Sequence, residues 1–220
     1  MFPLHDANPR HGPSYVMWLL VLANVIIFIY AFSRGPPEAV REFVTAYAFV
    51  PSAFFSSPLS ESYRLVTSIF LHGGVMHLLG NMWFLWVFGD NVEDRMGHGT
   101  FLLFYLGGGI VATLAHAVLA PGSPIPLVGA SGAVSAVLGA YILLFPTQRV
   151  LTFVPPLFVF WLPAWLYLGY WALVQFLQGT AGLVAGEAAI GGVAWWAHIG
   201  GFIFGMLMVR YLAKPKRPTR

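Results

Sequence analysis

The chain has 220 residues, of which 58% are hydrophobic and only 9% are charged, whereas soluble domains carry about 25% charged residues. This composition excludes an ordinary soluble protein and a disordered one, and the lack of cysteine excludes disulfides, thiolate nucleophiles and cysteine-ligated metals. The net charge of +3 comes mostly from the end of the chain, which indicates contact with a membrane surface and no nucleic-acid partner.

Residues 1–14 contain no apolar run and are expected to form a short polar tail in the cytoplasm. Residues 15–32 carry no charge and are long enough to cross a bilayer with little tilt, so we expect the first membrane-spanning helix here. A cleaved signal peptide is the alternative interpretation of this segment. It is disfavoured because the apolar run exceeds the roughly 7–15 residues of a signal-peptide core.

Residues 34–74 mix charged residues with aromatic pairs, a pattern that neither spans a bilayer nor dissolves freely. We expect this first long loop to lie partly in the membrane interface. Second and third spanning helices are predicted at 75–88 and 100–119, separated by a charged turn with glycine at both ends. The third helix ends before 120–126, where three prolines cannot continue it.

A fourth helix is predicted at 131–145, but it is too short to cross a hydrocarbon core, which takes about 20 residues. The missing length must come from the non-helical residues 127–130 entering the membrane. Such backbone is tolerated only where protein buries it or where it lines a wet cavity. The sequence therefore predicts a functional site inside the membrane at the start of this helix.

A fifth helix is predicted within 150–178, with an irregular start or a kink caused by its prolines. A glycine- and alanine-rich connector at 179–192 separates it from a sixth helix at 194–211, and a basic cytoplasmic tail follows at 212–220. With both termini in the cytoplasm, eight of the eleven basic residues lie on the inner side: Arg10, Arg95, Arg149, Arg210, Lys214, Lys216, Arg217 and Arg220. This distribution satisfies the positive-inside rule. We therefore expect an all-α fold with a single six-span domain at 15–211.

The predicted spans contain no Asp or Glu, which disfavours a transporter coupled to protons or cations. Ser131 stands at the predicted start of the fourth helix, where a helix N-terminus favours developing negative charge. The alternative interpretation is a helix cap, since serine is a preferred cap residue. The surrounding residues are not a nucleophile elbow G-x-S-x-G, because Ala133 occupies the last position.

His198 shares one face of the predicted sixth helix with Gly201 and Gly205. Two glycines beneath a histidine allow another backbone to approach closely, and the fourth helix offers a matching stripe of Ser131, Ser135 and Gly139. Pairing these stripes would bring the Ser131 hydroxyl and the His198 imidazole together. The alternative is a small-residue packing seam with an incidental histidine at the membrane interface.

His77 and Asn81 lie four residues apart, so they share one face of the predicted second helix. Two side-chain donors that point into a helix bundle can stabilise an oxyanion. The alternative is that they only bond neighbouring helices together. A metal site built from histidines is disfavoured, because no close histidine pair is accompanied by a carboxylate.

Several motifs along the chain occur in the order that is typical of one membrane protein family. They are Arg64 with Leu65 and Thr67, Phe70-Leu71-His72-Gly73-Gly74, His77-x-x-x-Asn81, Gly89-x-x-x-Glu93-x-x-x-Gly97, Gly129-Ala130-Ser131-Gly132, and Ala197-His198-x-x-Gly201-x-x-x-Gly205. Together they resemble the rhomboid family of intramembrane serine proteases, from about residue 47 to 205.

The resemblance implies a six-helix core in which Ser131 is the nucleophile and His198 is the general base. It also implies an oxyanion hole made by His77, Asn81 and the backbone N–H of Ser131. The remaining motif positions are then structural: Arg64, Glu93, Gly97, Gly129, Gly132, Gly201 and Gly205. No metal ion and no organic cofactor is implied.

Two positions depart from the family pattern. Tyr63 stands where the family has tryptophan beside the arginine, which keeps an aromatic ring next to Arg64. Ser135 stands where some members place a tyrosine against the catalytic histidine. The second departure leaves open what orients the imidazole of His198.

The expected function is a serine endopeptidase that cuts peptide bonds in or near transmembrane segments of membrane proteins through a Ser-His dyad. Every Asp of the chain is expected on the cytoplasmic side, so none can orient His198 from the outer side. The expected location is the bacterial inner membrane, with both termini in the cytoplasm. A non-catalytic relative that binds membrane segments is the alternative, and a channel or a scaffold without chemistry explains the clustered polar residues less well.

Overall fold

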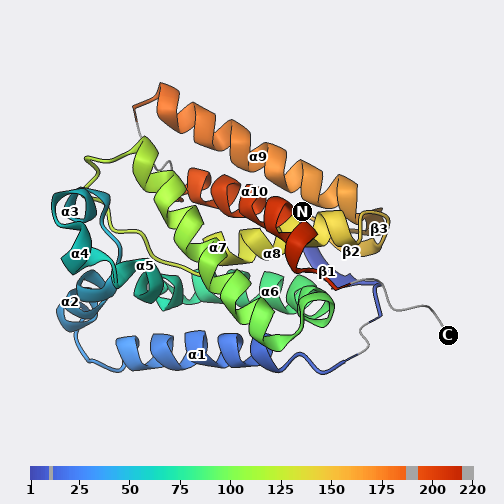
Figure 1. The fold of residues 1–220 in the computed structure, drawn as a ribbon, viewed down its shortest axis with the longest axis horizontal. Helices are drawn as coiled ribbons and strands as arrows, with labels where there is room; N and C mark the ends of the chain where they lie inside the picture. The colour runs from blue at the N-terminus through green and yellow to red at the C-terminus, as the bar shows by residue number, and fades with distance from the viewer. Residues whose placement is uncertain (10–11, 187–192, 215–220) are drawn as a thin grey trace.

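The computed structural model describes residues 1–9, 12–186 and 193–214, and this part of the chain is mostly helical. The long helices are α1 (Tyr15–Phe32), α6 (Val75–Met96), α7 (His98–Leu119), α8 (Ser131–Leu144), α9 (Ala164–Val184) and α10 (Trp195–Leu212). Between α1 and α6 lie α2 (Pro37–Tyr47), α3 (Pro51–Ser56), α4 (Pro58–Glu61), α5 (Arg64–Thr67) and the 3-10 helix η1 (Ser68–Phe70). Figure 1 shows α2, α3 and α4 gathered at one end of the long helices, with a small sheet at the opposite end.

The helices agree closely with the predicted ones where uncharged runs are bounded by turns. The first predicted helix coincides with α1, and α7, α8 and α10 lie within two residues of their predicted bounds. By length and hydropathy, α1 and α7 can each cross a membrane, and Pro58–Phe70 with Val75–Met96, bent by 80°, forms a third candidate within the described residues. The chain is thus an integral membrane protein.

A three-stranded antiparallel sheet corrects the expectation of an all-α fold. Its strands are β1 (Phe2–Asp6), β2 (Arg149–Val154) and β3 (Phe158–Pro163), in the order β1-β2-β3. Strand β1 therefore lies within the segment that was expected to be a polar tail. Strands β2 and β3 occupy the expected irregular start of the fifth helix, because the chain turns at Pro155-Pro156 and α9 begins only after Pro163.

The connector between the fifth and sixth helices also begins later than expected. Helix α9 continues to Val184, so residues 179–184 are helical. Residues 187–192 of the expected connector lie outside the described residues.

Strand β1 is held against the helices at both of its ends. The buried Asp6 carboxylate accepts hydrogen bonds from the Tyr141 hydroxyl at 2.5 Å and from Asn91 Nδ2 at 2.9 Å. At the other end, Trp83 Nε1 donates to the Pro3 carbonyl at 2.5 Å. The ring of Phe2 packs on that of Trp83, with centroids 5.4 Å apart. These contacts join the first residues of the chain to α6 and α8.

The attachment of β1 is expected to weaken as the pH rises. Burial raises the pKa of Asp6 to about 6 from 3.8, with Asp90 adding to the shift, while the Tyr141 hydrogen bond and His5 oppose it. The folded state therefore prefers protonated Asp6, and up to roughly 3 kcal/mol of stability present below pH 3.8 is lost as the pH rises through about 6. Hydrogen exchange of residues 2–6, corrected for intrinsic rates, should show weaker protection at about pH 7.5 than at about pH 5.

The control for this prediction is Asp6→Asn, which keeps a side-chain oxygen but cannot ionise. Its strand protection should be independent of pH over the same range. Equal pH dependence in the two proteins would contradict the assignment to Asp6.

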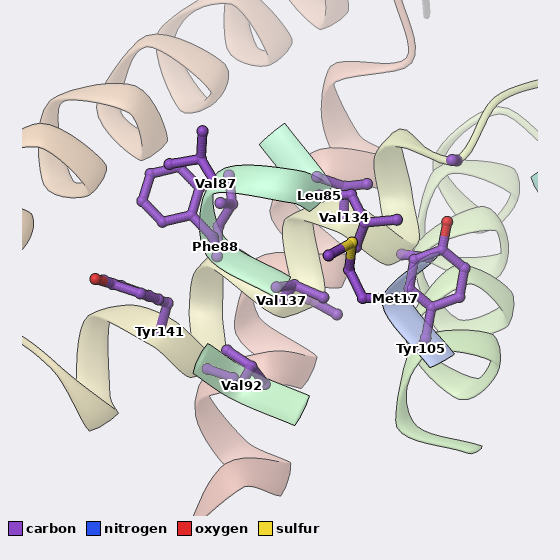
Figure 2. Close-up of a cluster of buried hydrophobic side chains, with 14 of the residues drawn as sticks. Met17, Leu85, Val87, Phe88, Val92, Tyr105, Val134, Val137 and Tyr141 are labelled. Atoms are coloured by element: carbon purple, nitrogen blue, oxygen red, sulfur yellow. The ribbon is translucent and has the colours of Figure 1, made fainter. Parts of the chain in front are cut away.

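Helix α8 lies at the centre of the bundle. Every residue from Gly132 to Tyr141 is buried. Figure 2 shows Val134, Val137 and Tyr141 of this helix among core side chains that come from α1, α6 and α7. A helix that is apolar all round and covered on all sides by protein does not have to match the bilayer thickness, which accounts for its shortness.

Helices α8 and α10 meet through their backbones. A Cβ atom added to Gly205 would overlap the carbonyl oxygen of Ala136, and one added to Gly201 would overlap that of Gly132. From the other helix, a Cβ atom on Gly139 would overlap the carbonyl oxygen of Phe202. The small-residue seam is therefore present. On α8 it includes Ser135 and Gly139 of the predicted stripe, and in addition Gly132 and Ala136, whose carbonyl oxygens meet the glycines of α10.

Glu93 joins α1 to the turn between α6 and α7. Its side chain is 1% exposed, and its carboxylate accepts the backbone N–H groups of Val16 at 2.9 Å and Met17 at 2.7 Å. A carboxylate at a helix N-terminus satisfies free N–H groups and complements the helix dipole. Four residues later, Gly97 has a φ of 84°, which favours glycine, and turns the chain into α7.

Candidate active site

A cavity of about 670 Å³ opens between α6, α8, α9 and α10. Its wall includes four residues that the sequence singled out: His77, Asn81, Ser131 and His198. The structure thus brings together side chains from three helices that are far apart in the sequence. Trp171 and Gln175 of α9 complete the wall next to His198.

Ser131 is the first residue of α8 and follows an irregular segment, as expected. Leu127 pairs with Phe49 through backbone hydrogen bonds of 2.7 and 3.1 Å. The backbone N–H of Gly129 donates to the Ser68 carbonyl at 2.9 Å. Gly129 has a φ of 123°, a conformation that side chains rarely adopt. These contacts fix non-helical backbone beside the cavity and leave the first N–H groups of α8 free of helical partners.

The side chains of His77 and Asn81 lie over the turn that leads into Ser131. A Cβ atom added to Gly129 would stand 2.7 Å from His77 Nε2 and 3.6 Å from Asn81 Nδ2. Asn81 is buried, and its Nδ2 atom also lies 3.1 Å from His72 Nε2. Glycine at 129 is therefore required twice, for its φ angle and for the space that His77 occupies.

The imidazole of His198 is held mainly by α9. Its Nδ1 atom lies 2.7 Å from Oε1 of Gln175, and its ring packs near Trp171, with centroids 6.1 Å apart. Trp195 contacts the ring from α10 itself, at 6.2 Å. Gln175 belongs to none of the motifs that the sequence shows. The signal that was available is an uncharged polar residue inside an apolar helix, one turn after Trp171.

Ser135 does not take the place of an aromatic partner for His198. Its hydroxyl donates to the Ser131 carbonyl at 2.6 Å, and the side chain is 1% exposed. A Cβ atom on Gly201 would stand 3.2 Å from Ser135 Cβ. The small side chain at 135 thus belongs to the seam between α8 and α10.

Tyr63 and Arg64 hold together parts of the loop between α1 and α6. Arg64 Nε lies 3.0 Å from Glu61 Oε2 and donates to the Tyr63 hydroxyl at 3.1 Å. That hydroxyl in turn donates to the Ala46 carbonyl at 3.0 Å, and Arg64 Nη1 donates to the Ala48 carbonyl at 3.4 Å. The pair therefore ties α5 to the end of α2.

The histidines near the cavity do not form a metal-binding group. The His72 and His77 rings meet edge to face at 5.1 Å, and His116 is buried on α7. Among the described residues, no three His, Asp or Glu side chains gather closely enough to hold a metal ion.

Comparison with known proteins assigns the chain to a family. A family model described as Rhomboid domain matches residues 59–215, which includes the cavity and all four residues named above. The chain belongs to the rhomboid family. Rhomboids are generally intramembrane serine proteases that act on membrane proteins.

The relatives of this rhomboid include bacterial and mitochondrial proteins. It is 33% identical over 212 residues to Presenilin-associated rhomboid-like protein A, mitochondrial, of Danio rerio, covering 91% of this chain and 48% of that protein. It is 33% identical over 213 residues to Rhomboid protein 1, mitochondrial, of Saccharomyces cerevisiae, covering 94% and 56%. With Rhomboid protease GluP of Bacillus subtilis it shares 33% identity over 137 residues, covering 62% and 26%. The chain thus spans about half or less of the length of these relatives.

Proposed function

We propose that this rhomboid is an intramembrane serine endopeptidase that hydrolyses peptide bonds in or near transmembrane segments through a dyad of Ser131 and His198. The observation that carries the proposal is that Ser131, His198, His77 and Asn81 line the same cavity. Packing alone explains the glycine seam, but it does not explain why these four polar groups face one space within an apolar bundle.

In the proposed reaction, His198 removes the proton of the Ser131 hydroxyl as the oxygen attacks the substrate carbonyl. Nδ1 of His198 is engaged with Gln175, so Nε2 is the nitrogen available to act as the base. His198 then returns the proton to the leaving amine, and water hydrolyses the acyl-enzyme with the same base.

The oxyanion of the tetrahedral intermediate is proposed to lie beside the turn at Gly129. The backbone N–H of Ser131 is at a helix N-terminus, where it has no intrahelical partner and the helix dipole favours negative charge. Asn81 Nδ2 and His77 Nε2 lie next to the same turn and supply two further donors. Donors that are fixed before the reaction stabilise developing charge without reorganisation.

Substrates are proposed to be transmembrane helices that unwind easily. A helix hides its carbonyl groups in its own hydrogen bonds, so attack requires local opening. Glycine, proline or small residues near the scissile bond lower the cost of that opening.

The membrane arrangement is proposed as six spanning helices, α1, α6, α7, α8, α9 and α10, in one domain over 15–211. Residues 34–74 then form an interfacial loop, and the segments 1–14 and 212–220 lie on the cytoplasmic side. The positive-inside distribution of the basic residues supports this orientation. We propose the bacterial inner membrane as the location.

The proposed activity is tested with the purified protein in proteoliposomes that contain a tagged single-span reporter. The wild type should cleave the reporter and react with a fluorophosphonate, whereas Ser131→Ala and His198→Ala should give only background in both assays. Equal cleavage by Ser131→Ala would assign the activity to another nucleophile. If the wild type neither cleaves any of several reporters nor reacts with the fluorophosphonate, the result favours the alternative, a non-catalytic binder of membrane segments.

A further inference from the structure

Gln175 provides the hydrogen bond that orients the imidazole of His198. The bond joins Gln175 Oε1 and His198 Nδ1 at 2.7 Å, and the glutamine side chain is 7% exposed. Because Gln175 is buried, little water competes for its side-chain oxygen, so the bond is stronger than it would be at the surface.

The acceptor character of Oε1 decides which imidazole nitrogen carries the proton. A carbonyl oxygen accepts hydrogen bonds and cannot donate, so Nδ1 of neutral His198 must hold its N–H toward Gln175. Nε2 then keeps its lone pair. The lone pair is what a general base needs in order to accept the proton of Ser131.

The other contacts of the ring do not make this choice. Trp171 and Trp195 touch His198 through aromatic faces and edges, and such contacts place a ring but do not distinguish its two nitrogens. Ser135 is engaged with the Ser131 carbonyl. Within the described part of the chain, Gln175 is the residue whose side chain hydrogen-bonds His198.

We propose that Gln175 is the positioning residue of this enzyme: it holds His198 in the tautomer with Nε2 as the base, directed to the cavity and Ser131. The proposal rests on the dyad proposed above. Gln175 moves no proton itself. When Nε2 takes the serine proton, the Nδ1–H group remains hydrogen-bonded to the glutamine oxygen. The partial negative charge of that oxygen stabilises the imidazolium.

Trp171 and Gln175 stand one turn apart on α9, so this helix supplies both an aromatic contact and the hydrogen bond of the base. The catalytic geometry therefore depends on how α9 packs against α10. A rhomboid that has serine at position 135 obtains from the fifth long helix of the bundle what an aromatic side chain on α8 would otherwise supply.

Replacement of Gln175 by methionine tests the proposal, because methionine has a similar length and no acceptor oxygen. We expect kcat on the reporter to fall roughly 10- to 100-fold with little change in KM, since the base is misoriented while the substrate contacts remain. The rate of fluorophosphonate labelling of Ser131 should fall by a similar factor. Gln175→Glu retains an acceptor oxygen and should keep more activity than Gln175→Met.

Gln178→Met is the matched control, because Gln178 lies on the same helix with its side chain exposed. It should match the wild type in kcat and in labelling rate. If Gln175→Met also matches the wild type in both, Gln175 does not position the base.

A second measurement needs no variant of Gln175. Nitrogen-15 spectra of the histidines in the wild type, with His198 assigned by comparison with His198→Ala, should show the Nδ1–H tautomer. The Nε2–H tautomer would overturn the proposal even if Gln175→Met failed to fold. A wild type that is neither active nor labelled would refute the dyad instead, and the tautomer would still test the contact with Gln175.

Discussion

Replacing Gly205 by alanine is expected to prevent stable packing of α10 against α8. The added Cβ atom would overlap the carbonyl oxygen of Ala136, which is backbone and cannot rotate away as a side chain can. The two helices would have to separate, and this would also disturb the neighbouring close approaches at Gly201 and Gly139. Overpacking of this kind costs about 3 kcal/mol or more, a large part of the 5–15 kcal/mol that stabilises a typical protein.

The matched control for Gly205→Ala is Gly169→Ala, a substitution of the same kind in a long helix. A Cβ atom at Gly169 would meet nothing within 4 Å, and alanine is the better helix former, so its stability should be unchanged or slightly raised. Thermal unfolding in detergent, followed by tryptophan fluorescence, compares the two variants with the wild type. A transition of Gly205→Ala as high as that of Gly169→Ala would show that the seam is not closely packed.

The sequence predicted most of the long helices because their signal is local. An uncharged run such as that of α1 can be recognised without knowledge of its neighbours, and prolines and glycines bound the other helices. The close contact between α8 and α10 could also be predicted, since glycines spaced along one helix face indicate close approach of another helix. The part that Gly132 and Ala136 take in it was not predicted, because it depends on how the two helices cross.

The sheet and Gln175 were missed because each depends on partners that lie elsewhere in the chain. Strand β1 pairs with β2, for instance Phe2 with Phe153, and nothing in the first residues alone indicates that pairing. Likewise, Gln175 and His198 are 23 residues apart and meet only when α9 packs against α10. A polar residue in an apolar helix signals that it has a partner but does not name that partner.

The candidate site residues could be selected from the sequence because polar residues are rare in its apolar segments. Four polar residues stand out in these segments: Ser131, His198, His77 and Asn81. The motifs that contain them occur along the chain in the order typical of the rhomboid family. The structure shows all four on the wall of one cavity. Their catalytic roles stay predictions that kinetics must test.

Removal of the Asn81 side chain is expected to lower kcat strongly with little effect on KM. Its Nδ2 atom lies beside the turn at Gly129, where the proposed oxyanion forms, so Asn81→Ala removes a donor that acts in the transition state. Loss of one such donor costs about 10²–10³ in kcat. Initial rates of reporter cleavage over a range of substrate concentrations in the bilayer give both constants.

Asn24→Ala is the control for Asn81→Ala, because Asn24 is also a buried asparagine on a long helix. Its Nδ2 atom donates to the Leu20 carbonyl of its own helix at 2.7 Å, and it is not among the residues that line the cavity. Its kcat should remain near the wild-type value. A kcat of Asn81→Ala equal to that of Asn24→Ala would remove Asn81 from the oxyanion hole and leave it as the partner of His72.

The double variant Asn81→Ala with His77→Ala shows whether the side chains of Asn81 and His77 donate to the same oxygen. If both donors stabilise one oxyanion, removing the second donor affects an oxyanion that has already lost the first. The combined decrease in kcat should then be smaller than the product of the two single decreases. Independent effects that multiply fully would instead place His77 at a different step, such as binding of the substrate. A role of His77 in substrate binding would be consistent with its exposed side chain, whereas that of Asn81 is buried.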